Sequence, residues 1–421
     1  MVFAQSAVKA ESSSSPDVNA VFSDSKALYL DLHQHPELSK HETETAAKLS
    51  AKLRALGYEV TEHIGGAGIV AIMKNGSGPT VMLRTELDAL PVEERTGLPY
   101  ASKVRMKDDA GNDVSVMQAC GHDLHMSSLY GAAAIMAKTN DTWHGTLMLL
   151  GQPAEETITG AKAMLEDGVF KRFPKPDVGL ALHDTNEMPA GQISITPGAM
   201  SSNADSLRVT IFGHGGHGSA PNTTIDPIVI AARTITALQT IVARELRPGT
   251  FGVVTVGYIH GGTKNNIIPD SVEMGLTVRT YNADVRGHIL KAITRIVNAE
   301  AQGANVERIP TIERYEFTDA VVNDPALSEK LRVQEKLALG GDNVINLPPG
   351  SGSEDYSFFI TAGVPSVYID LGAANQKAFE EAKAAGRNLP SLHSSLFAPD
   401  VDPALKTGIA AEVTALRSLL Q

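Results

Sequence analysis

The feature that most constrains the fold is a series of short apolar runs, each bounded by Gly or Pro. Four of them lie in the first half of the chain, at residues 68–73, 80–84, 145–150 and 178–182. Runs of this length are typical of strands buried on both faces. Between them, residues 126–137 and 160–166 carry apolar side chains at helical spacing, and residues 20–56 predict two helices separated by Pro36. This alternation predicts an α/β domain with a mixed sheet flanked by helices.

A second pattern of predicted strands and helices begins near Ser201. Residues 206–212, 252–258, 272–280 and 306–313 read as strands, and residues 226–246 and 288–300 read as helices. The order strand, helix, strand, strand, helix, strand is that of a ferredoxin-like α+β domain. After about residue 317 the α/β rhythm resumes and ends in a helix over 404–420. We therefore expect a domain of residues 19–200 and 317–421 with a smaller domain, 201–316, inserted in it.

The N-terminal segment, residues 1–18, is rich in Ser and lacks a periodic apolar face, which predicts a disordered lead-in. It contains no apolar core of the length that a signal peptide needs. Residues 3–7, however, resemble the small-residue end of such a peptide. Two locations stay open, the cytoplasm and, if a leader was trimmed, the bacterial periplasm or the exterior.

Charge and cysteine content exclude several classes of protein. The chain of 421 residues has a formal net charge of −12, which disfavours binding to nucleic acid or anionic lipid. No apolar stretch approaches the roughly 20 residues of a membrane-spanning helix. A single cysteine, Cys120, rules out an intramolecular disulfide and a zinc finger. Taken alone, Cys120 reads as a small buried hydrophobe.

Four short segments contain residues that could perform chemistry. They are Cys120-Gly-His122, Glu155-Glu156, Leu182-His183 and Leu392-His393, and the middle two follow or end predicted strands. Each has an alternative interpretation; the acidic pair, for example, could simply begin a helix. Open α/β sheets bind ligands beyond the carboxyl ends of their strands, so these fragments could converge. Thiolate, imidazole and carboxylate together are a metal-binding set.

Nine fragments in order along the chain resemble the di-metal amidohydrolases, a family of hippurate hydrolases, aminoacylases and auxin–amino-acid conjugate hydrolases related to zinc carboxypeptidases. The resemblance extends from about residue 25 to about 415. The fragments begin at His33, Arg84, Ala119, Gln152, Leu182, Gly213, Asn266, Gly352 and Leu392.

The resemblance implies two divalent metal ions, zinc or manganese first and cobalt or nickel as alternatives. The ligands that it implies are Cys120, His122, Glu156, His183 and His393, with Cys120 as the bridging thiolate. Glu155 matches the general base, which takes a proton from a metal-activated water and passes it to the leaving amine.

The inserted domain supplies further residues by the same resemblance. His217 matches a histidine that stabilises the oxyanion, in many relatives from the partner subunit of a homodimer. Asn266 and Arg279 match residues that hold the substrate carboxylate. Without the resemblance, His217 reads as a turn residue and Arg279 as a solvated strand residue.

Some positions depart from the family pattern. The run Glu86-Leu-Asp88 begins with a carboxylate one methylene longer than usual, and Gln118 stands where a His is common. Neither is an expected ligand. Asp88 and Glu354 are expected near the ligands, where such groups orient them.

The resulting prediction is a metal-dependent hydrolase that cleaves N-acyl or N-aroyl amino acids. A dipeptidase or carboxypeptidase is the alternative on the same site, and N-carbamoyl hydrolysis is a weaker one. From another class, a catalytically inactive binding protein could keep this fold, although the presence of Glu155 argues against it.

Overall fold

The structure is a computed structural model that describes residues 11–421, and these divide into two compact units. Unit 1 holds the described residues up to Gly198 together with Val322–Pro348 and Phe358–Gln421. Unit 2 holds Ala199–Val321 and, in addition, the short stretch Pro349–Ser357, for which the sequence pattern gave no sign.

The predicted disordered lead-in, residues 1–18, is corrected in its second part. Residues 1–10 lie outside the described part of the chain. Glu11 is buried and pairs with the buried Arg417 of the C-terminal helix. Ser15 caps helix α1 (Pro16–Gln34) by accepting the backbone N–H of Val18. Because these contacts are long-range or capping contacts, the Ser-rich composition did not reveal them.

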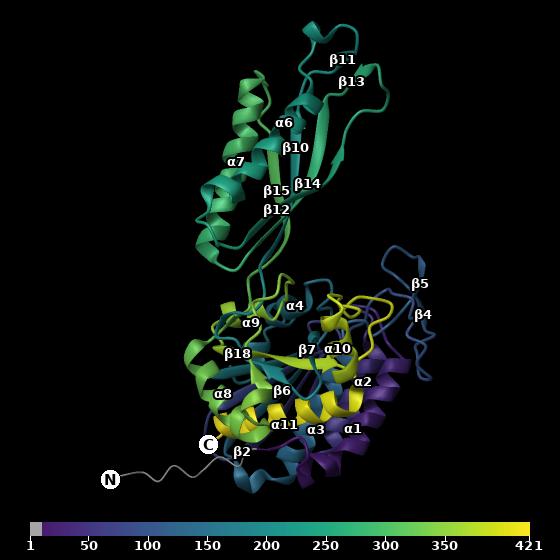
Figure 1. Ribbon diagram of the computed structural model, residues 1–421, viewed down its shortest axis with the longest axis vertical. Helices are drawn as coiled ribbons and strands as arrows, with labels where there is room; N and C mark the ends of the chain where they lie inside the picture. Colours follow the sequence, from purple (N-terminus) through teal and green to yellow (C-terminus); the bar gives the residue numbers. More distant parts are fainter. Residues whose placement is uncertain (1–10) are drawn as a thin grey trace, which may run out of the picture. The chain divides into compact units, whose positions relative to one another are not determined.

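Unit 1 is built on a mixed sheet of eight strands (Figure 1). In spatial order the strands are β1 (Glu59–Ile64), β2 (Gly68–Asn75), β6 (Gly145–Gln152), β3 (Thr80–Glu86), β7 (Val178–Pro189), β18 (Ser366–Ala374), β8 (Ile193–Ser194) and β17 (Val344–Ile345). The central strands β6, β3, β7 and β18 are mutually parallel, whereas β2 and β8 join them antiparallel. The predicted α/β class with a mixed sheet is confirmed.

Three helices pack together along this sheet: α1, α3 (His122–Lys138) and α11 (Val401–Leu419). α3 packs on β3 and β7, and α11 on β18, so the apolar side chains of the strands are buried beneath them. The other helices of this part of the chain are α2 (Thr43–Ala55), α4 (Gly160–Glu166), α5 (Val169–Arg172), α8 (Pro325–Leu339), α9 (Ser357–Thr361) and α10 (Gln376–Ala384). Among residues 11–421, no helix combines the length and the apolar character needed to span a bilayer.

Unit 2 is a four-stranded antiparallel sheet with two helices on it. Its strands, in the order β12 (Gly252–His260), β14 (Ser271–Thr280), β10 (Ala204–Phe212) and β15 (Thr311–Thr318), pack against α6 (Pro227–Thr240) and α7 (Ala283–Gly303). The chain order β10, α6, β12, β14, α7, β15 is the ferredoxin-like order. The last strand was expected at 306–313 but begins at Thr311, because it is an edge strand whose side chains are mostly exposed and carry little apolar pattern.

Short strands complete the fold. β4 (Arg105–Lys107) and β5 (Asp113–Ser115) form a hairpin in unit 1, and β11 (Gly216–His217) pairs with β13 (Ile267–Ile268) in unit 2. β9 (Gly198–Ala199) and β16 (Val322–Asn323) are found where the chain passes from one unit to the other.

Candidate metal centre

The carboxyl ends of three parallel strands meet at one edge of the sheet in unit 1. β3 ends at Glu86, β7 carries His183, and Glu155 and Glu156 follow the end of β6. This is the edge where open α/β sheets bind ligands. Helix α3 begins at the same place, with His122 as its first residue.

Cys120 is at the centre of a cluster of potential metal ligands. Its Sγ lies 3.2 Å from Nε2 of His393 and 3.6 Å from Nε2 of His183. Nε2 of His393 is also 3.4 Å from Oε1 of Glu156. Burial raises the pKa of the Cys120 thiol well above its ordinary value, and the charges of Glu156 and Glu155 raise it further. A cation in this place would oppose both effects and favour the thiolate.

His122 presents a buried nitrogen without a hydrogen-bond partner. Its Nδ1 donates to the backbone carbonyl of Asp88 at 2.8 Å, so once the ring is neutral the lone pair is on Nε2. That Nε2 has no partner among the described residues, and it lies 4.0 Å from Oε1 of Glu156. Burial lowers the pKa of His122, but the hydrogen bond to Asp88 and the charge of Glu86 outweigh it and raise the pKa to about 10.

His183 is held as a neutral imidazole. Burial, and next the positive charge of His125, lower its pKa to about 4. Its Nδ1 donates to the backbone carbonyl of Asp184 at 2.9 Å. The lone pair on Nε2 therefore faces Sγ of Cys120, as a metal ligand requires.

Two unusual backbone conformations bring these side chains together. Gly121 precedes α3 with φ +75°, and a Cβ there would lie 2.4 Å from Oδ2 of Asp184, so only glycine fits. His393 also has a positive φ of 66°. Its amide donates to the carbonyl of Ala119 at 2.8 Å, which places His393 beside Cys120 although 273 residues separate them.

The acidic pair does not begin a helix, so that alternative interpretation is wrong. Glu155 and Glu156 lie in the loop between β6 and α4, and Glu155 is buried. The loop is held at Ala154, whose amide donates to Glu42, and at Glu156, whose amide donates to Oδ2 of Asp88 at 3.0 Å. Ligand atoms of His122, Glu155 and Glu156 all lie within 4.8 Å of one another.

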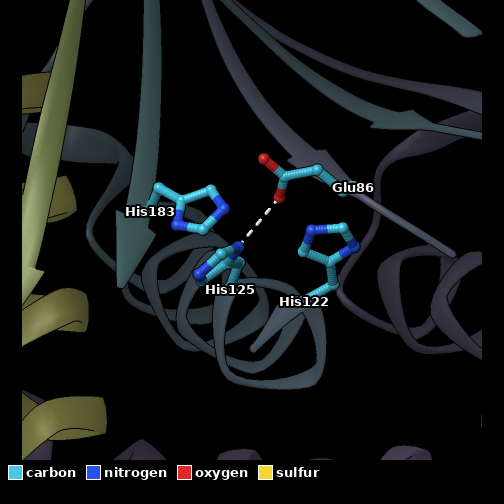
Figure 2. Close-up of side chains that lie close together, drawn as sticks. All are labelled: Glu86, His122, His125 and His183. Atoms are coloured by element: carbon cyan, nitrogen blue, oxygen red, sulfur yellow. Dashed lines mark hydrogen bonds and ion pairs between the residues drawn. The ribbon is translucent and has the colours of Figure 1, made fainter. Parts of the chain in front are cut away.

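A buried polar network beneath the centre was not predicted as functional. Figure 2 shows Glu86, His122, His125 and His183 converging from β3, α3 and β7. Nδ1 of His125 is 2.9 Å from Oε2 of Glu86, and its Nε2 is 3.2 Å from Oδ1 of Asp184. His125 follows His122 by three residues, and residues at this spacing are neighbours on one face of a helix. This spacing could have indicated from the sequence that His125 lies near the metal centre.

The remaining predicted residues belong to unit 2. His217 lies on β11, and the amide and hydroxyl of Ser219 lie 3.1 and 2.8 Å from its Nδ1. The backbone carbonyl of Asn266 accepts the amide of Gly218, so Asn266 and His217 are neighbours. Arg279 stands near the other end of β14, half-buried, with Nη1 unpartnered among the described residues. Glu354 accepts the amide of Tyr356 at 2.8 Å.

The residues of unit 1 fit a pair of divalent metal ions. The donor set is one sulfur, imidazole nitrogens and carboxylate oxygens, which suits borderline divalent ions. Cys120, Glu156 and His393 form one group of ligand atoms within 4.8 Å, and His122, Glu155 and Glu156 form another that shares Glu156. The unpartnered Nε2 of His122 supports the fit, because a buried nitrogen without a partner is costly unless a ligand occupies it.

Comparisons with known proteins relate the chain to metallopeptidases and amidohydrolases. The model of peptidase family M20/M25/M40 matches residues 82–386. Two thermostable carboxypeptidases of Saccharolobus solfataricus are 36% identical over 90% of this chain and 91% of theirs. The hippurate hydrolase of Campylobacter jejuni is 38% identical over 78% of this chain and 82% of its own. A solved Bacillus subtilis structure, described as a dinuclear metal binding peptidase from the M20 family, superposes with a TM-score of 0.76 and 26% identity, covering 94% of this chain and 98% of that one.

The fold and the site define a metal-dependent hydrolase of amide bonds that works with a pair of divalent ions. The chain belongs to peptidase family M20/M25/M40. The resemblance identified from the sequence is thereby confirmed, and the interpretation as an inactive binding protein is set aside.

Proposed function

We propose that the chain hydrolyses N-acyl and N-aroyl amino acids at a metal pair held by Cys120, His122, Glu156, His183 and His393. The observation that carries the proposal is Sγ of Cys120, which contacts the Nε2 atoms of both His183 and His393. A lone buried thiol between two imidazoles and a carboxylate is a poor hydrophobic contact and a good metal ligand. The hippurate hydrolase among the relatives supports the substrate class.

The ions that we propose are zinc or manganese, with cobalt and nickel as alternatives that the same donors accept. The thiolate favours zinc, and availability in the cell decides among ions of similar affinity.

Glu155 is proposed as the general base. The metal pair, when bound, lowers the pKa of a water and polarises the amide carbonyl. Glu155 then takes the proton and delivers it to the leaving amine. Glu155 is buried, and a carboxylate oxygen of Glu155 lies within 4.8 Å of ligand atoms of His122 and Glu156. This proximity to two proposed metal ligands suits the role of a base.

His217 is proposed to stabilise the oxyanion. Its Nδ1 accepts the amide N–H of Ser219, so the neutral ring carries its proton on Nε2 and can donate there. Such a donor contributes several kcal/mol, roughly 3 to 4 in measured cases. Asn266 and Arg279 are proposed to hold the carboxylate of the amino acid, and the unpartnered Nη1 of Arg279 supports this role.

The positions of these residues within unit 2 support the proposal of a homodimer. His217 lies on β11, which pairs with β13, and Asn266 directly precedes β13. Ser271 begins β14 three residues after β13 ends, and Arg279 lies eight residues further along that strand. Eight strand residues span roughly 26 Å. One copy of unit 2 cannot bring both ends to one small substrate, so we propose that His217 and its neighbour Asn266 act on the substrate of a partner subunit, which Arg279 of that subunit also contacts.

A second candidate function is cleavage of a C-terminal residue from a short peptide. The carboxypeptidases at 36% identity over 90% of the chain favour it, and the same metal site would serve both reactions.

The test is a panel of hippurate, N-acetyl amino acids and dipeptides on metal-reconstituted protein, with release of amine as the measurement. Glu155→Gln should keep both ions and lose about 10²-fold or more in kcat. Glu166→Gln, which changes an exposed carboxylate paired with Lys162, is the matched control and should act as wild type. Unchanged activity of Glu155→Gln would remove its role as the base, and turnover of dipeptides alone would favour the second function.

The dimer is tested by mixing two inactive variants. His217→Ala and Glu155→Gln, refolded together, should regain activity in mixed dimers that keep one intact site. Failure to regain activity in a verified mixed dimer would show that His217 acts within its own subunit.

A further inference from the structure

Unit 1 contains a cavity of about 610 Å³ that is lined by residues other than the proposed metal ligands. One wall is Thr185–Glu187 at the end of β7, and the other is the segment from Phe379 on α10 to Leu392. Figure 1 shows α10 beside β7. The volume lies within the range of small-molecule sites, about 300–1,000 Å³, and far exceeds the needs of an acetyl group.

The two walls are continuations of the segments that carry metal ligands. Thr185 is two residues after His183, and Leu392 directly precedes His393. Because Sγ of Cys120 contacts both imidazoles, the cavity adjoins the place where the scissile amide must lie.

Hydrogen bonds fix the backbone around the cavity. Nδ2 of Asn186 donates to the carbonyl of Pro390 at 2.8 Å and ties one wall to the other. Helix α10 ends at Ala384, and Gly386, just beyond its C-cap, has a positive φ of 61°. The amide of Arg387 then donates to the carbonyl of Ala382 at 2.9 Å. These contacts fix the backbone position from which the side chain of Arg387 extends.

The lining combines apolar surface with positive charge. Phe379, Leu389 and Leu392 are partly buried and line it, together with the exposed cations Lys383 and Arg387. Neither cation has a carboxylate partner in the described part of the chain. The lining also holds one anion, Glu187, so its charged side chains sum to +1 in a chain of net charge −12.

We propose that this cavity binds the acyl half of the substrate, and that Lys383 and Arg387 select acyl groups that end in a carboxylate. The proposal rests on the proposed hydrolysis of N-acyl amino acids. There, Asn266 and Arg279 of unit 2 are assigned the carboxylate of the amino acid, which leaves the acyl half for a cavity of unit 1. The apolar side chains contact the methylene or ring part of the acyl group, and the two cations contact its charged end.

The experiment compares N-succinyl, N-benzoyl and N-acetyl derivatives of one amino acid on the full chain loaded with metal. Arg387→Glu should lower the ratio of kcat/KM for the N-succinyl to the N-acetyl substrate by about tenfold, because an attraction becomes a repulsion. Lys377→Glu makes the same charge change on α10 outside the cavity and is the matched control, with an unchanged ratio. Leu389→Trp should reduce the ratio of kcat/KM for the N-benzoyl to the N-acetyl substrate, because the larger side chain fills part of the cavity.

Each result decides the proposal. If wild type hydrolyses N-acyl amino acids but Arg387→Glu and Leu389→Trp leave the ratios unchanged, the cavity is not the acyl site and the proposed function stands. An equal change of the ratio in Lys377→Glu would show a general charge effect and overturn the role of Arg387. If the metal-loaded protein hydrolyses none of the three substrates, the proposed function fails, and the acyl site fails with it.

Discussion

Asp88 offers the sharpest test of the candidate metal centre, because it contacts two proposed ligands without being one. Its buried carboxylate accepts the hydroxyl of Ser39 at 2.7 Å and the amide of Glu156 at 3.0 Å. Its Oδ1 is 3.4 Å from Nδ1 of His122. Burial raises the pKa of Asp88, but the hydrogen bond and charge of His122 outweigh this and lower it, so the group is ionised at neutral pH.

Asp88→Asn keeps the volume and removes the charge and one acceptor. Loss of a group that orients a metal ligand costs about 10- to 100-fold in metal affinity, or about 1.4–2.8 kcal/mol. We expect the value to be near the upper end, since Asp88 contacts His122 and the segment of Glu156 together.

The assay is competition between stripped protein and a chromophoric chelator for Zn²⁺. Asp177→Asn is the control, because Asp177 also accepts a backbone amide, that of Thr80 at 2.8 Å, at the start of β3 away from the site. A folded Asp88→Asn protein that binds both ions within about threefold of wild type would refute the reasoning, since neither His122 nor Glu156 would then depend on Asp88.

Three further predictions concern pH and packing. The pKa of His122 without metal is about 10, so a metal ion must displace its proton, and the apparent metal affinity should rise with pH toward 10. Calorimetry in buffers of different ionisation enthalpy measures the released proton. A metal affinity that stays constant between about pH 7 and 9 would contradict this prediction. Burial raises the pKa of Glu412 to about 8, although the hydroxyl of Ser128 donates to it. The folded state therefore holds this proton more tightly than the unfolded chain, and wild type loses stability as pH rises from about 4.5 through 8. Glu412→Gln should remove this loss and add at most about 5 kcal/mol to the unfolding free energy at pH 9; lower stability in urea there would contradict it. Gly121→Ala sets a Cβ against Asp184 and should cost more than about 1 kcal/mol, seen as a lower melting temperature, whereas an unchanged one would refute the steric argument.

The elements that the sequence predicted well are those whose pattern depends on neighbours along the chain. The expected helix at residues 160–166 coincides with α4, and the runs at 68–73 and 145–150 fall within β2 and β6. Buried strands need apolar side chains on both faces, so their runs are visible without knowledge of the fold.

The elements that it placed less well depend on contacts between distant segments. The helix expected over 226–246 ends as α6 at Thr240, where the backbone widens into a π-helical turn. β15 is shifted because an exposed edge strand has little pattern to read. Residues 11–15 are held by Arg417 and by a helix cap, neither of which composition reports.

The order of residue types along the chain was enough to predict the class of fold, the donor types of a metal site and the family resemblance. Which of these residues come into contact depends on how the chain folds. Cys120 and His393 are in contact across 273 residues because the amide of His393 bonds to Ala119 in a positive-φ conformation. His122 keeps an unpartnered nitrogen because Asp88 takes its other one. The cavity at Arg387 likewise exists only where α10 and β7 lie together. Convergence of side chains depends on strand register and backbone conformation. The order of residue types along the chain does not specify either of them.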